Sequence, residues 1–118
     1  WLCLGSRIIL AVGIVFKGNT IIGNKTSLNG AYGIFLDHSC DNTLASNNVN
    51  LNHWSGIWLE CSPNNTLTDN TMSENRYNFA VGGYAVSHYI NVIDASNEVN
   101  QKPVVYLIDT KDLIIDSS

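Results

Sequence analysis

Short apolar runs, separated by asparagine and glycine, make up most of the chain. Within the runs, apolar and polar residues alternate, which is the pattern of half-buried β-strands rather than of helices. The runs return in the same order, so that Gly33-Ile34-Phe35-Leu36 is followed one repeat later by Gly56-Ile57-Trp58-Leu59. The pattern predicts three short strands in each of the first two repeats, at Thr20–Ile22, Lys25–Leu28, Gly33–Leu36, Thr43–Ala45, Asn48–Leu51 and Gly56–Leu59.

Asparagines mark the repeat with a constant spacing of 23 residues. A period in the twenties is typical of a solenoid, in which each repeat forms one coil stacked on the next. Neighbouring coils lie about 4.8 Å apart, so a side-chain amide can donate to one copy of itself and accept from the other. We therefore predict three asparagine ladders, formed by Asn19, Asn42 and Asn65, by Asn24, Asn47 and Asn70, and by Asn29, Asn52 and Asn75.

The repeats also predict coil boundaries and a core. Residues 19–41, 42–64 and 65–86 are clear repeats, the third shortened by one turn residue after Asn75. Residues 1–18 are expected to be a degenerate first coil, and residues 87–118 a turn and a further coil, with a strand at Val104–Ile108 and a new coil opening at Lys111–Asp116. The inward columns are predicted to be Ile21/Leu44/Leu67, Thr26/Val49/Met72 and Ile34/Ile57/Phe79. We expect one all-β domain of about four to five coils that belongs to a longer β-helix.

The composition argues against several classes of function but does not identify one. The chain has 118 residues, a net charge of −4 and only six Lys and Arg residues, which are scattered singly. No basic stripe is present, so nucleic acid is not an expected partner. Sixteen asparagines disfavour helices, because the Asn amide competes for backbone hydrogen bonds. No nucleotide-binding, nucleophile-elbow or zinc-protease motif occurs, which argues against the cofactor-dependent enzyme classes.

The Gly-Ile-x-Leu segments, the Asn-Thr-hydrophobic coil starts and the stretch 87–107 together resemble the NosD-like family. The resemblance implies a right-handed single-stranded parallel β-helix of the pectin-lyase-like type, found in carbohydrate-binding proteins and sugar hydrolases, and an exported location at the cell surface, in the medium or in the periplasm. The family is often labelled copper-binding. Its usual Asn-Gly-Lys-Pro turn reads Asn100-Gln101-Lys102-Pro103 here, so this turn must form without the freedom of glycine.

One candidate metal site combines an imidazole with two thiols. Stacking places His38 on Cys61, and Cys40 lies two residues along the same segment, so the three side chains could approach a soft metal such as copper or zinc. No fourth ligand is apparent, and isolated His and Cys residues in turns usually pack without a metal. The prediction is therefore no cofactor, with copper kept as the alternative at His38, Cys40 and Cys61.

A second candidate is the stacked carboxylate pair Asp37 and Glu60. Two carboxyl groups about 5 Å apart have the separation of a retaining glycosidase, and their repulsion would raise one pKa toward general-acid use. The alternative is a pair of solvated acids at the ends of strands, with Lys17 available as a cross-coil partner. Catalysis by Asp37 and Glu60 is thus the weaker interpretation.

The favoured site is an outward face. Strand alternation points Phe35 and Trp58 away from the core, and one period between them predicts rings stacked about 4.8 Å apart. We expect Lys17, Asp37 and Glu60 to rim this shelf, where a sugar ring could stack. The predicted function is a non-catalytic exported scaffold that binds a polysaccharide or a protein. The alternatives are a polysaccharide lyase or hydrolase fragment and a copper-handling accessory protein.

Overall fold

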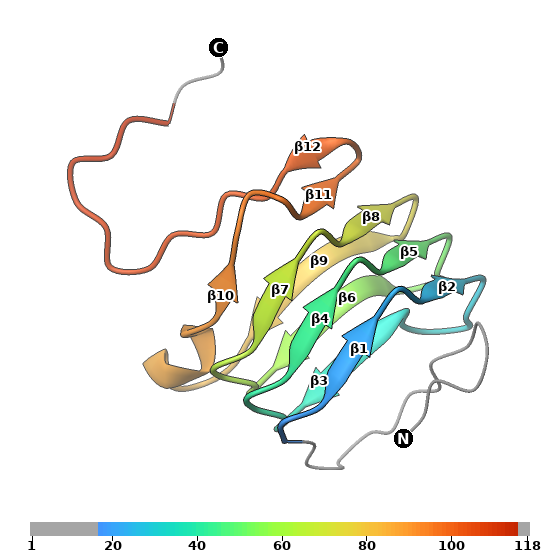
Figure 1. The fold of residues 1–118 in the computed structure, drawn as a ribbon, viewed down its shortest axis with the longest axis horizontal. Coiled ribbons are helices and arrows are strands. Elements are labelled where there is room, and N and C mark those ends of the chain that lie inside the picture. The colour runs from blue at the N-terminus through green and yellow to red at the C-terminus, as the bar shows by residue number, and fades with distance from the viewer. Residues whose placement is uncertain (1–16, 116–118) are drawn as a thin grey trace.

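The chain folds as a parallel β-solenoid of about three turns, and its computed structural model describes residues 17–115. Three sheets run along the stack (Figure 1). The first contains β1 (Thr20–Ile22), β4 (Thr43–Ala45), β7 (Thr66–Thr68) and β10 (Val92–Ile93). The second contains β2 (Lys25–Ser27), β5 (Asn48–Asn50), β8 (Thr71–Ser73), β11 (Glu98–Val99) and β12 (Lys102–Pro103). The third contains β3 (Ile34–Asp37), β6 (Ser55–Glu60) and β9 (Tyr77–Gly82).

The strand register follows the sequence period. Thr20 lies beside Thr43 and Thr43 beside Thr66, all in parallel strands. In the third sheet Ile57 pairs with Phe79, so the shift falls to 22 residues, as the missing residue after Asn75 predicts. The predicted fold class and the predicted stacking of these repeats are confirmed, whereas the degenerate coil expected at 1–18 lies almost wholly outside the described residues.

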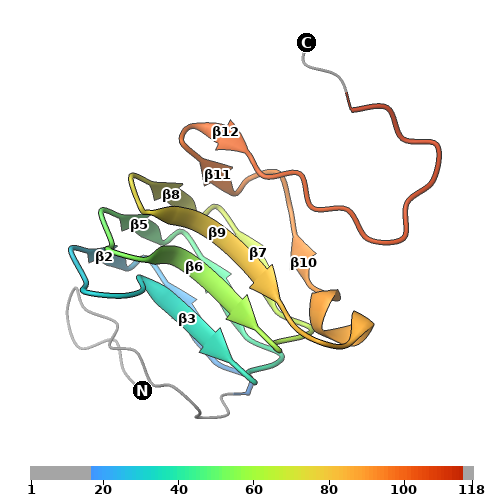
Figure 2. The ribbon, with the colours of Figure 1, turned by 180° about the vertical axis from the view of Figure 1, so that it is seen from behind.

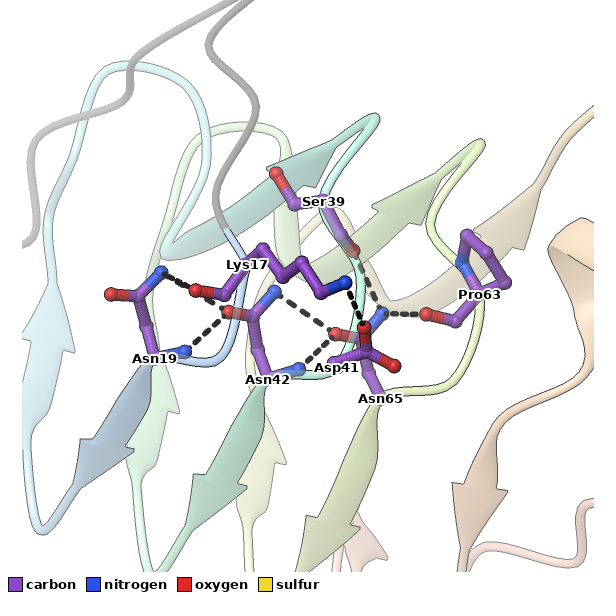
Figure 3. Close-up of polar contacts among 7 residues, drawn as sticks. All are labelled: Lys17, Asn19, Ser39, Asp41, Asn42, Pro63 and Asn65. Carbon is purple, nitrogen blue, oxygen red and sulfur yellow. Dashed lines mark hydrogen bonds and ion pairs between the residues drawn. The ribbon is translucent and has the colours of Figure 1, made fainter.

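The three predicted asparagine ladders are present. Figure 3 shows the first of them, in which the backbone N–H and the Nδ2 of Asn19 donate to Oδ1 of Asn42 at 2.9 and 3.2 Å. Asn42 repeats both bonds to Asn65 at 2.9 and 3.1 Å. One amide oxygen thus accepts two donors from the coil before it, and the ladder satisfies the backbone N–H of each donating asparagine.

Each ladder gains a fourth asparagine that the strict period did not predict. Asn65 donates to Asn91 and Asn70 donates to Asn97, over 26 and 27 residues. The longer spacing follows from the inserted 3₁₀ turn η1 (Val86–Tyr89), after which the chain returns to the first sheet as β10. The third ladder ends differently, because Asn75 donates to Asn78 of β9, only three residues later.

The core consists of the predicted inward columns. Leu44, Val49, Ile57 and Leu67 are 0% exposed and Met72 is 1% exposed. Ile21 and Phe79, at the two ends of their columns, are partly buried and pack against this core. Burial of like residues on like residues in successive coils provides the hydrophobic stabilisation of the solenoid.

Tight corners explain the glycine in each Gly-Ile-x-Leu segment. A Cβ on Gly33 would lie 2.8 Å from Asn52 Nδ2, and a Cβ on Gly56 would lie 2.7 Å from Asn75 Nδ2. Such distances are shorter than real carbon contacts, so only glycine lets the third sheet pass this close to the ladder amides.

The residue before a ladder asparagine often has a left-handed backbone conformation, as at Leu28 and Leu51 with φ of 56° and 53°.

The C-terminal end departs from the prediction. β11 and β12 form an antiparallel hairpin whose central residues Asn100 and Gln101 have φ of 50° and 66°, the signs that a type I′ turn requires. The expected strand at Val104–Ile108 is wrong, and residues 111–115 form no strand. The reason is that β12 occupies the free edge of β11 and directs the chain back over the end of the core, where Val104 and Tyr106 pack. Figure 2 shows the chain crossing the end of the stack after β12 and only then running away from it.

No helix within residues 17–115 has the length and apolar character needed to cross a membrane.

Candidate functional site

Three aromatic side chains gather on the outer face of the third sheet. Phe35 and Trp58 pair in register between β3 and β6 and point outward, as predicted. Tyr32, just before β3, stacks on Phe35 with ring centroids 4.7 Å apart and an interplanar angle of 19°. All three are half-buried. We call Tyr32, Phe35 and Trp58 the aromatic cluster.

The predicted face-to-face stacking of Phe35 and Trp58 is wrong. Their centroids are 6.1 Å apart and the planes meet at 75°, so the indole stands edge-on to both Phe35 and Tyr32. In this orientation its Nε1 donates to Glu60 Oε2 at 2.9 Å. Edge-to-face packing suits the ring quadrupoles, and here it also satisfies the indole N–H. The cluster therefore presents one stacked pair and one ring edge rather than a continuous shelf.

The stacked carboxylates lie where the repeat places them. Asp37 pairs with Glu60 in the β3–β6 register. Glu60 accepts the Trp58 N–H and is contacted at 3.8 Å by the Cys61 Sγ, while Asp37 Oδ1 lies 2.6 Å from His38 Nδ1. Both acids thus belong to the rim of the aromatic cluster. Their use as a catalytic pair remains a prediction.

Lys17 does not join this rim. It forms a parallel bridge with Cys40, and its Nζ lies 3.5 Å from Asp41 Oδ2, at the corner of the first ladder (Figure 3). The expected place of Lys17 on the rim requires a spacing of 20 residues between Lys17 and Asp37. The true spacing is the regular 23, which places Lys17 beside Cys40 and moves it away from the aromatic cluster.

The candidate metal ligands lie in equivalent turns of successive coils, with His38 and Cys40 between β3 and β4 and Cys61 between β6 and β7. His38 and Cys61 are stacked and share a left-handed backbone with φ of 49°. Cys61 is buried, and desolvation and then the charge of Glu60 raise the pKa of its thiol. Cys40 is half-buried, and desolvation followed by its hydrogen bond to Asp41 raises the pKa of its thiol. Within residues 17–115, no three His, Cys, Asp or Glu side chains are grouped so that they could hold a metal ion.

Sequence reasoning missed two aromatic contributions. Tyr32 directly precedes the Gly-Ile-x-Leu segment, and this position was the available signal. Trp54 and Tyr77 form a second group at the corner before β6 and β9, with centroids 5.3 Å apart and Arg76 Cζ 4.6 Å above the Trp54 ring. Trp54 and Tyr77 are 23 residues apart and lie on successive coils, so the repeat spacing was the available signal for this pair.

The comparisons with known proteins give one family. The sequence model of the family described as periplasmic copper-binding protein (NosD) matches residues 7–106. No curated protein and no solved structure shows a significant match to the chain.

The family description can be compared with the copper ligands that this chain offers. Copper prefers thiolate, thioether and imidazole ligands. In the described part of the chain, Met72 is 1% exposed inside the core, Cys61 is a buried thiol with a raised pKa, and His38 Nδ1 is engaged by Asp37. These residues do not fit a ready copper site.

Proposed function

The chain belongs to the NosD family of periplasmic copper-binding proteins, and on this premise we propose that it is an exported, non-catalytic β-helix scaffold that binds a polysaccharide through its aromatic cluster. The periplasmic description of the family supports export. The observation that carries the proposal is the outward group of Tyr32, Phe35 and Trp58, half-buried beside two carboxylates.

The chemistry of the cluster favours a sugar. The stacked Tyr32–Phe35 pair offers apolar ring area on which the C–H face of a sugar ring can lie. Glu60 and Asp37 at the rim supply oxygens that can accept hydrogen bonds from hydroxyl groups. The strands beneath are held by the ladders, so the site is preorganised and little conformational entropy is lost on binding.

The test compares two tryptophan variants. Trp58→Ala removes the edge-on ring of the cluster, whereas Trp54→Ala removes an equally half-buried ring that packs with Tyr77 instead. Both variants are first checked for folding by circular dichroism. Affinity electrophoresis in gels that contain polygalacturonate or a neutral glucan then measures binding.

Retardation that disappears in Trp58→Ala and persists in Trp54→Ala would support the proposal. Equal retardation of Trp58→Ala and the parent would exclude this face. If the parent binds no member of an acidic and neutral panel, the polysaccharide proposal fails, and a protein ligand becomes the next candidate for the same face.

A second candidate function is copper handling, for which the family description is the supporting observation. The chain's own thiols are the residues to test, with Cys61→Ser against the parent in a copper titration. A stoichiometry that Cys61→Ser leaves unchanged would remove the His38, Cys40 and Cys61 set from consideration. A loss of one bound copper would favour that set.

A further inference from the structure

A pocket separate from the aromatic cluster lies at the C-terminal end of the solenoid. It has a volume of about 530 Å³ and lies between the segment that follows β9 and the segment after β12. The residues that determine its character are Tyr84, Val86, Tyr89, Tyr106, Leu107 and Asp109. Small-molecule sites commonly have volumes of about 300–1,000 Å³ and mostly apolar and aromatic walls.

Hydrogen bonds hold the two walls of this tyrosine pocket together. The Tyr89 hydroxyl donates to Gly83 O at 2.8 Å within the first wall. The Tyr106 hydroxyl donates to Tyr89 O at 2.6 Å and so joins the second wall to the first. Tyr106 also packs against the solenoid core, and Tyr84 lies edge-on to His88 with centroids 4.7 Å apart. The pocket is thus formed before any ligand binds.

Within the described part of the chain, the residues that line the pocket carry one negative charge and no positive charge. Asp109 is the only formally charged residue among its described lining residues, which include no Lys, Arg or His. Burial raises the pKa of the Tyr106 phenol, so this ring stays neutral at pH 7. The faces of aromatic rings carry negative electrostatic potential and attract cations. An anion would meet both Asp109 and these ring faces without a compensating positive charge, and a neutral ligand would gain only apolar contact.

We propose that the tyrosine pocket binds a small organic cation with a methylated ammonium group. Its methyl groups would bury apolar surface against Val86 and Leu107, while its charge would face the tyrosine rings and Asp109. This site shares no residue with the aromatic cluster, so it does not depend on the proposed polysaccharide function. Tyr84 is 83% exposed, which makes its ring accessible to a ligand and its substitution safe for the fold.

The experiment compares a cation with its neutral isostere on the 118-residue chain. Choline and 3,3-dimethylbutan-1-ol have nearly the same shape and differ in the charge of the head group. Ligand-observed NMR titration measures both affinities. We expect choline to bind about fivefold or more tightly than the alcohol, the ratio that a partly exposed cation–π site provides. Equal affinities, or no choline binding, would overturn the proposal.

Four variants locate the site. Tyr84→Ala and Asp109→Asn are each expected to weaken choline about threefold or more, while Tyr84→Phe keeps the ring and retains binding. Tyr77→Ala is the matched control, because Tyr77 is an exposed tyrosine outside the pocket. Unchanged affinity in Tyr84→Ala, or a loss in Tyr77→Ala equal to that in Tyr84→Ala, would refute the assignment to this pocket. Loss of binding in Tyr84→Phe would also refute it, because the hydroxyl rather than the ring would then hold the ligand.

Discussion

Asn70 is the residue at which the energetic role of a ladder can be measured. It is 0% exposed and lies in the middle of the second ladder. Its Oδ1 accepts the N–H of Asn47 at 3.1 Å and the Nδ2 of Asn47 at 2.9 Å. Its Nδ2 donates to Leu44 O and to Asn97 Oδ1, both at 2.8 Å. Asn70→Ala removes all four of these hydrogen bonds and no inward apolar column.

The cost follows from which groups lose their last partner. Asn47 Nδ2 keeps Ile21 O at 2.9 Å, and Asn97 Oδ1 keeps the backbone N–H of Asn70 at 3.2 Å. The buried backbone N–H of Asn47 keeps none, and such an orphaned donor costs about 1–3 kcal/mol. With the three other bonds at about 0.5–1 kcal/mol each, Asn70→Ala should lower the free energy of unfolding by about 3–5 kcal/mol. That corresponds to a fall in Tm of roughly 10–25 °C.

Urea and thermal unfolding, followed by circular dichroism, measure this change. Asn48→Ala is the matched control, because Asn48 is an exposed asparagine of β5 whose amide only accepts from Asn50 Nδ2 at 3.2 Å. Its cost should stay within about 0.5 kcal/mol. If the two variants unfold at the same urea concentration, the ladder bonds do not stabilise the fold and the reasoning fails.

Asn70→Asp distinguishes the hydrogen bonds that this side chain accepts from those that it donates. A carboxylate can accept from Asn47 but cannot donate, and it would face Leu44 O and Asn97 Oδ1. Burial near these oxygens raises the folded-state pKa of the new acid above its unfolded value. The variant should therefore be least stable at neutral pH, recover as pH falls through the raised folded-state pKa, and recover fully below about pH 4. Stability that does not change relative to the parent over this range would contradict the donor role.

Three further substitutions test the packing by thermal unfolding. Ile57→Asp places a charge at a side chain that is 0% exposed and should cost about 4 kcal/mol or more, so a variant that melts with the parent would show the register to be wrong. Gly56→Ala sets a Cβ 2.7 Å from Asn75 Nδ2 and should cost about 1–3 kcal/mol, whereas Gly30→Ala meets nothing within 4 Å and should cost far less. Thr26→Val replaces a fully buried hydroxyl that has no hydrogen-bond partner and should raise the free energy of unfolding by about 1 kcal/mol; a lower free energy of unfolding would contradict this reasoning.

The amino-acid sequence alone determined the solenoid, the positions of most strands and the first three asparagines of each ladder. In a stacked fold, residues one period apart are neighbours, so Asn19, Asn42 and Asn65 are in contact because of their spacing alone. The same argument placed Ile57 between Ile34 and Phe79 and paired Asp37 with Glu60. Long-range contacts could be predicted there because the repeat turns them into a periodic pattern along the chain.

Only the tertiary structure shows what happens in the segments that depart from the 23-residue spacing. Insertion of η1 lengthened the coil that begins at Asn65 and brought Asn91 and Asn97 into the ladders, and the β11–β12 hairpin turned Val104 and Tyr106 over the core instead of into a strand. The tilt of Trp58 toward Glu60 also lay beyond the pattern. Spacing sets which backbone positions are neighbours, but ring orientations, end caps and pockets depend on side-chain packing between segments that no repeat relates.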